Sequence, residues 1–233
     1  MPLIKSILHN NPSQWDIFCF AALKTQNITL LGALAVIESS MHSETELRKL
    51  SEKAFQNACE LLDESLLLFK GKYFPRAYLL AHLASEELAK LPIIYGTRVR
   101  MKGKEEIDWR HFKKRLTGHQ AKLRSIALFD YMNDEFDLIG NTDVERYNNQ
   151  LGFIKKYDLL KNMGLYSGYH ENTVFKPSEQ FDSELAESMI NLTKGRLECL
   201  KTRWLDMISG EVTEKGYKAH KVIIDILNEA ESS

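Results

Sequence analysis

The chain has 233 residues, of which 44% are hydrophobic and 27% charged, and its formal net charge at pH 7 is −1. This composition excludes a disordered or fibrous chain and is typical of a globular protein. The charge excludes a global attraction to nucleic acid or membranes, so any such attraction must come from a local patch. Three cysteines without metal-binding spacing favour reduced thiols and a cytoplasmic protein: Cys19, Cys59 and Cys199.

Residues 1–44 are predicted to be an N-terminal helical extension packed on the main domain, residues 45–233. The extension contains the longest apolar stretch, IFCFAALKTQNITLLGALAVI, which is interrupted by four residues: Lys24, Thr25, Gln26 and Asn27. A membrane span needs ~20 nearly uninterrupted apolar residues. The first residues also lack the pattern of a cleavable signal peptide. We therefore expect no membrane contact.

The rest of the chain reads as long helices with short breaks. Helices are predicted over residues 45–69, 75–100, 109–131, 143–162, 178–207 and 217–228. Pro75 suits the first turn of its helix, whereas Pro92 predicts a kink. Asp108 and Ser178 are expected as N-caps. Because no clear β-strand alternation is found, the fold class is predicted to be all-α, a helical bundle.

The helix over residues 75–100 carries charges where apolar residues are expected. It is apolar on nearly all sides, which is typical of a central helix, yet it contains Glu86, Glu87 and Lys90. An unpaired buried charge is very costly, so these groups need partners. The helical period of the next helix turns His119 inward and places Lys122 close to it. We therefore predict a polar cluster of these five residues between the two helices.

The predicted cluster has two interpretations. Carboxylate and imidazole groups can act as acid and base, so the cluster could be catalytic. Alternatively, Glu86 and Glu87 form ordinary helical pairs with Lys90, and His119 is a core residue with satisfied hydrogen bonds. His82 and Glu86 could also ligate a metal with His119, but three such residues without a fixed fourth ligand are a weak pattern. We expect no metal and no cofactor.

Three motifs occur in an order that resembles the AbiV family of abortive-infection proteins. They are Glu86-Glu87-Leu88-Ala89-Lys90, His119-Gln120-Ala121-Lys122, and Gly164-Leu165-Tyr166 with Pro177 downstream. The first motif ends the segment SLLLFKGKYFPRAYLLAHLASEELAK, and the resemblance covers about residues 51–181. The third motif is usually L-Y-V-D in the family, whereas this chain has Leu165-Tyr166-Ser167-Gly168.

The resemblance implies a HEPN-like helical bundle that forms a homodimer. It also implies a role in antiphage defence, in which a phage-encoded protein activates the chain and translation is blocked. Many HEPN proteins are ribonucleases with an Arg-x4–6-His motif. Arg76 and His82 have that spacing, without the polar residue that often follows the Arg, and Tyr166 lies in the third motif. The alternative is that Arg76 begins a helix and His82 packs in the core.

A local basic field lies between Arg98 and Arg124, with ten basic and three acidic residues. Trp109, His111 and Phe112 are interleaved with the basic residues. Such a patch can hold RNA phosphates and stack a base. The expected contacts are Arg110, Lys113, Lys114 and Arg115. A solvated helix face is the alternative interpretation.

The sequence leaves two functions open. One is a toxic effector of phage defence that acts on RNA or on the translation machinery, as a HEPN-type ribonuclease if it is an enzyme. The other is a protein-binding module of a defence or toxin–antitoxin-like complex, in which the polar cluster is structural.

Overall fold

The computed structural model describes residues 43–135, 157–170, 173–214, 216–218 and 220–222. The chain divides into two compact units, residues 1–46 and 47–233. The predicted extension lies outside the described residues except at its end, so its packing remains a prediction. None of the described helices is long and apolar enough to cross a membrane.

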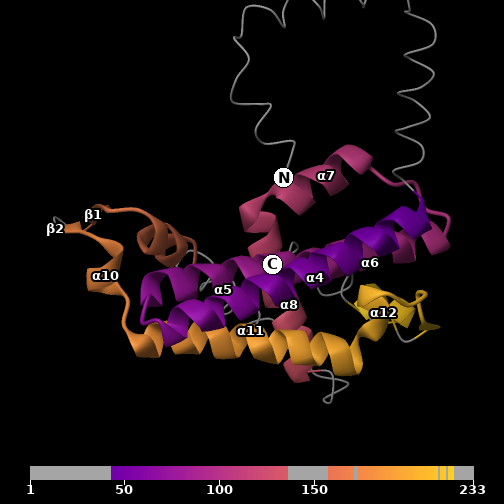
Figure 1. The fold of residues 1–233 in the computed structure, drawn as a ribbon. Coiled ribbons are helices and arrows are strands. Elements are labelled where there is room, and N and C mark those ends of the chain that lie inside the picture. Colours follow the sequence, from indigo (N-terminus) through magenta and orange to yellow (C-terminus); the bar gives the residue numbers. More distant parts are fainter. Residues whose placement is uncertain (1–42, 136–156, 171–172, 215, 219, 223–233) are drawn as a thin grey trace, which may run out of the picture. The chain divides into compact units, whose positions relative to one another are not determined.

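The second unit is a helical bundle, and the predicted all-α class is confirmed (Figure 1). Its described elements are α4 (Glu44–Lys70), α5 (Phe74–Leu88), α6 (Lys90–Lys102), α7 (Trp109–Thr117), α8 (His119–Glu135), α10 (Pro177–Gln180), α11 (Ser183–Arg203) and α12 (Leu205–Ile208). Residues 157–165 are also helical, as are the described residues from 214 to 222.

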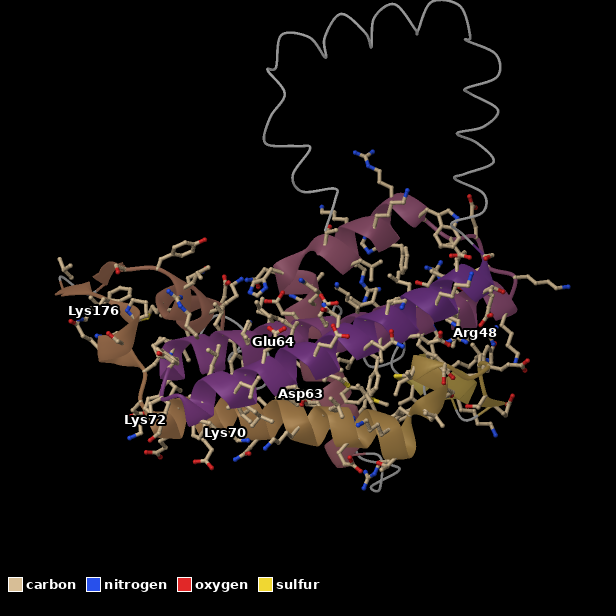
Figure 2. The ribbon with its side chains drawn as sticks, viewed as in Figure 1. Arg48, Asp63, Glu64, Lys70, Lys72 and Lys176 are labelled. Atoms are coloured by element: carbon tan, nitrogen blue, oxygen red, sulfur yellow. The ribbon has the colours of Figure 1, made fainter. Side chains whose placement is uncertain are left out.

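The core is built around α5, whose small residues let neighbouring helices approach closely. Ala77, Ala81 and Ala84 are fully buried in the main apolar cluster with residues of α4 and α11. The Ser65 hydroxyl on α4 donates to the Ala77 carbonyl at 2.6 Å. The Thr193 hydroxyl on α11 donates to the Ala81 carbonyl at 3.0 Å. These bonds satisfy buried hydroxyls and tie both helices to α5. The outer side of α4 carries exposed charges, including Asp63, Glu64 and Lys70 (Figure 2).

A break between α5 and α6 falls at Ala89, three residues before Pro92. Proline has no N–H to bond the carbonyl four residues earlier, and its ring crowds that carbonyl. That carbonyl belongs to Leu88, the last residue of α5. The predicted interruption of this helix is therefore present, one turn earlier than the proline itself.

Three sequence predictions of the elements need correction. The helix expected over residues 109–131 is two helices, because Gly118 has an extended backbone with ψ of 118°. The long C-terminal helix is capped by Asp182, whose side chain accepts a hydrogen bond from the Leu185 N–H, rather than by Ser178. A short antiparallel hairpin, β1 (Gly168–His170) and β2 (Thr173–Phe175), was not predicted. Strands of three residues are too short to show alternation.

Candidate functional site

Glu86 on α5 is the centre of a group of charged side chains within the bundle. Only 6% of its surface is exposed, and its carboxylate contacts three side chains. Oε1 lies 3.2 Å from Nε2 of His82 and 2.6 Å from Nδ1 of His119. Oε2 lies 2.6 Å from Nζ of Lys122. Three of the five predicted cluster residues, Glu86, His119 and Lys122, are thus brought together by the structure.

Helical spacing explains how two elements supply these groups. His82 and Glu86 are four residues apart on α5, so both lie on one side of that helix. His119 and Lys122 are three residues apart on α8, which packs against α5. Gly118 has an extended backbone that ends α7, and α8 begins at the next residue, His119.

The helical residues 157–165 supply two members that the sequence did not predict. Oδ1 of Asp158 lies 2.8 Å from Nε2 of His119, so this imidazole has a carboxylate at each nitrogen. Nζ of Lys161 lies 3.5 Å from Oδ1 of Asp158 and 3.9 Å from Oε1 of Glu86. We call these six residues the Glu86 cluster: His82, Glu86, His119, Lys122, Asp158 and Lys161.

The surroundings set the protonation of the two buried members. Burial alone raises the pKa of Glu86, but the contacts with His82, Lys122 and His119 outweigh it and lower the pKa well below its usual value. Burial lowers the pKa of His82, although Glu86 opposes that shift. At neutral pH the cluster therefore holds an ionised carboxylate beside a neutral His82 imidazole.

Several polar atoms of the cluster are buried within ion-pair distance of a partner but without an aligned hydrogen bond: Nε2 of His82, both ring nitrogens of His119 and Oε1 of Glu86. Nδ1 of His82 is buried without a hydrogen bond to any of the residues that the structure describes.

Three members have the chemistry of metal ligands. Donor atoms of His82, Glu86 and His119 lie within 4.8 Å of one another. However, the ammonium groups of Lys122 and Lys161 face the same carboxylate, at 2.6 and 3.9 Å. Their repulsion of a cation opposes metal binding, and the same charges favour an anionic ligand.

The other predicted catalytic residues lie elsewhere. Glu87 and Lys90 form an ion pair with each other at 2.5 Å, and both side chains are partly exposed. Arg76 donates to the carbonyls of Gly164 and Leu165, at 2.9 and 3.1 Å, and so stabilises the end of the 157–165 helix. Tyr166 is 63% exposed. Arg76 and His82 therefore engage different partners, and only His82 belongs to the Glu86 cluster.

Not all basic residues between Arg98 and Arg124 are free to form an exposed basic surface. Arg98 is fully buried and donates to the carbonyls of Asp206 and Gly210. Lys102 donates to the Val212 carbonyl. These two residues hold the segment after α11. The four expected contacts all lie exposed on α7: Arg110, Lys113, Lys114 and Arg115.

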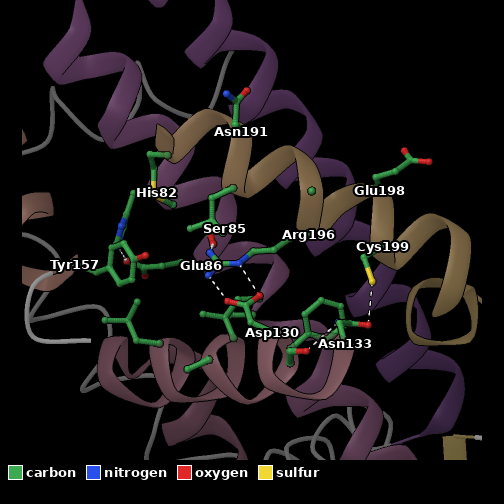
Figure 3. Close-up of a pocket in the computed structure, with 18 of the residues that line it drawn as sticks. His82, Ser85, Glu86, Asp130, Asn133, Tyr157, Asn191, Arg196, Glu198 and Cys199 are labelled. Atoms are coloured by element: carbon green, nitrogen blue, oxygen red, sulfur yellow. Dashed lines mark hydrogen bonds and ion pairs between the residues drawn. The ribbon is translucent and has the colours of Figure 1, made fainter. Parts of the chain in front are cut away.

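A pocket of about 750 Å³ adjoins the cluster, and His82, Glu86 and Tyr157 contribute to its wall (Figure 3). In the middle of the pocket, Arg196 of α11 binds both carboxylate oxygens of Asp130, at 2.9 and 2.5 Å. Much of the remaining wall is apolar, from residues such as Ile126, Phe129 and Met189. Sequence analysis missed Arg196, although a basic residue on the inward face of an amphipathic helix is a usable signal.

A comparison with models of known protein families shows which family the chain belongs to. The family model HEPN AbiV, described as AbiV, matches residues 46–198, which is more than half of the chain. The chain belongs to the AbiV family. The predicted resemblance and the HEPN-like helical fold are thereby confirmed. Membership of AbiV suggests a role in abortive-infection defence. Searches of curated proteins and of solved structures gave no match.

Proposed function

We propose that this AbiV protein is a toxic effector of abortive infection that acts on RNA, with the Glu86 cluster as its working site. One observation carries the proposal: an ionised carboxylate is buried in an all-helical bundle and connects through His119 to the more exposed Asp158 and Lys161. Buried charge of this kind is costly, and sites that combine perturbed pKa values with acid–base groups are often functional.

The chemistry that fits these residues is metal-independent phosphodiester transfer. The 2′-hydroxyl oxygen of RNA attacks the phosphorus, and the bond to the 5′ oxygen breaks. The proton that leaves the 2′-hydroxyl passes to the His119 system and returns to the 5′ oxygen, which leaves a 2′,3′-cyclic phosphate and a 5′-hydroxyl. Lys122 and Lys161 would offset the charge that develops on the phosphate oxygens.

The direct test is an RNA cleavage assay with purified protein in the presence of a chelator. Parent protein should cut single-stranded RNA and leave 2′,3′-cyclic phosphate ends, and His119→Ala should lower the rate by about 10²-fold or more. His220→Ala is the matched control, because His220 lies outside the Glu86 cluster and lines a different, smaller pocket beside Pro92 and Gly96. Cleavage by His119→Ala at the parent rate would reject the Glu86 cluster as the catalytic site.

A protein-binding module is the second candidate. It is favoured by the close contacts of the Glu86 carboxylate with His82, His119 and Lys122, which a purely structural ion-pair network would also make. Under this function the cluster fixes the packing of α5 against α8, and protection requires a partner protein from the phage or the host. The absence of any RNA cleavage, together with capture of a purified phage activator, would support it.

A further inference from the structure

Asp158 and Lys161 differ from the inner members of the Glu86 cluster in their exposure. The side chains of His82 and Glu86 are 2% and 6% exposed, whereas those of Lys161 and Asp158 are 20% and 33% exposed. The side chain of His119 is 21% exposed, but both of its ring nitrogens are buried. The cluster thus runs from a buried anchor on α5, through these nitrogens, to two charged groups that solvent reaches, so a ligand from solvent meets Asp158 and Lys161 before it meets Glu86.

We infer that Asp158 and Lys161 form the RNA-contacting end of the site: Lys161 binds the phosphate, and Asp158 exchanges the proton of the 2′-hydroxyl with His119. This inference rests on the proposed action on RNA. It gives separate roles to the two members of the Glu86 cluster that lie on the 157–165 helix, whereas the other members lie on α5 and α8. The proton path is the one already given, with one proton taken from the 2′-hydroxyl and one returned to the 5′ oxygen.

The contacts of Lys161 leave its charge available. Its ammonium lies 3.5 Å from Asp158 and 3.9 Å from Glu86, whereas ammonium–carboxylate hydrogen bonds are about 2.7–2.9 Å long. Lys122, in contrast, lies 2.6 Å from Glu86. A phosphate oxygen can therefore approach Lys161 without breaking a close ion pair.

The position of Asp158 suits proton exchange. Its Oδ1 is 2.8 Å from Nε2 of His119, and its Oδ2 accepts a hydrogen bond from Gln120 at 3.3 Å. With Glu86 at the other ring nitrogen, a carboxylate–imidazole–carboxylate chain leads from the interior to solvent. A proton taken up by Asp158 can pass to His119, since acid and base are within hydrogen-bond distance.

The adjacent pocket gives the nucleoside a place to lie. Its wall includes Tyr157, His82 and Glu86, whereas Asp158 and Lys161 are not among its lining residues. Its volume lies within the range of about 300–1,000 Å³ of pockets that accommodate small ligands, which is enough for one nucleoside beside Glu86. Aromatic rings commonly stack on unpaired bases, which makes single-stranded RNA the substrate class.

The test compares a substitution of Lys161, which should weaken RNA binding, with a substitution of Asp158, which should not. Lys161→Met should weaken binding of a fluorescent single-stranded RNA and reduce the slope of log affinity against log salt by about 0.7, because one phosphate contact is lost. Lys161→Arg should restore the slope. Asp158→Asn should bind the RNA at least as tightly, because a negative charge is removed, yet cleave it about 10²-fold more slowly.

Exposed positions provide matched controls: Lys194→Met on α11 and Asp63→Asn on α4 should behave as the parent. Melting curves should remain close to the parent, because both tested side chains are partly exposed. If Asp158→Asn fails to fold, the comparison of Lys161→Met with Lys161→Arg still decides the phosphate contact. Parent behaviour of the Lys161 and Asp158 variants, with His119→Ala inactive, would overturn the inference and leave the proposed function intact. Parent behaviour of His119→Ala as well would reject the proposed function itself.

Discussion

At the scale of single residues, Glu86 shows how a buried charge is tolerated. Removing one partner from a buried ion pair typically costs about 3–5 kcal/mol, because the other charge is left uncompensated. Glu86 has three close partners, His82, His119 and Lys122, so the loss of any one leaves two in place. We therefore expect single substitutions at the more exposed His119 to be milder than substitutions of Glu86 itself.

The stability of the fold should depend on pH through His82 and Glu86. The folded pKa of His82 lies below its unfolded value of about 6.5, so the unfolded chain binds a proton first and stability falls as the pH drops below about 6.5. The folded pKa of Glu86 is also lowered, so its contribution is present above about pH 4.3 and is lost as the pH falls further.

Urea unfolding between pH 8 and pH 3 should show both losses. His82→Gln should reduce the first loss, near pH 6.5 and below, and keep the second. The part of the first loss that remains comes from His220, whose pKa is also lowered by burial. His111→Gln should show the same profile as the parent, since His111 is exposed on α7. A free energy of unfolding that stays constant from pH 7 to pH 5 in the parent would contradict the assigned burial of a neutral His82.

Sequence reasoning found part of the Glu86 cluster and missed the rest for a physical reason. The inward direction of His119 follows from helical period, which is local, and the structure confirms its proximity to Glu86. Asp158 is about as close to His119, at 2.8 Å, and Lys161 lies 3.9 Å from Glu86, but their helix meets these residues only through the tertiary fold. Period alone cannot tell which helices are neighbours. For Glu87 the alternative interpretation, an ordinary helical pair with Lys90, matches the structure.

At the scale of elements, the bounds of a helix were predictable where a capping residue or a helix-breaking segment stands at its end. The expected helix 45–69 is α4, and Asp108 is the N-cap of α7, where it accepts from the His111 N–H at 2.8 Å. The helix expected over residues 109–131 included Gly118, although glycine costs about 1 kcal/mol relative to alanine in a helix interior. Gly118 is the C-cap of α7, where its N–H donates to the Lys114 carbonyl, and so it separates α7 from α8.

The exposed basic face of α7 makes a separate prediction. If Lys113 and Lys114 contact RNA phosphates, reversing both to Glu should weaken RNA binding to a similar extent for all sequences and reduce its salt dependence. Fluorescence anisotropy at several salt concentrations measures both quantities. Reversing Lys49 and Lys53 on α4 provides a control with the same change in charge. Equal RNA affinity in the α7 double variant and the parent would refute the patch.

At the scale of the whole molecule, we predict a homodimer. The prediction rests on HEPN membership and on apolar residues of the N-terminal segment, Phe18, Phe20, Leu30, Leu31 and Ile37, which lie outside the described residues. Symmetric dimers are the commonest soluble oligomers. Sedimentation at micromolar concentration should give twice the chain mass of 26.9 kDa. Only the 26.9 kDa species at that concentration would count against dimerisation.

The central claim is that the Glu86 cluster works in defence and does more than stabilise the bundle. The most direct measurement pairs phage protection with melting temperature for His119→Gln and Lys122→Met, with Lys194→Met as control. Glutamine keeps an N–H donor toward Glu86 but cannot carry a proton at neutral pH. A change of 1 kcal/mol shifts the melting temperature of a chain this long by about 2–4 °C. We predict that His119→Gln loses protection while its melting temperature stays within a few degrees of the parent. Protection that survives in both folded variants, or that declines only in step with melting temperature, would contradict the claim.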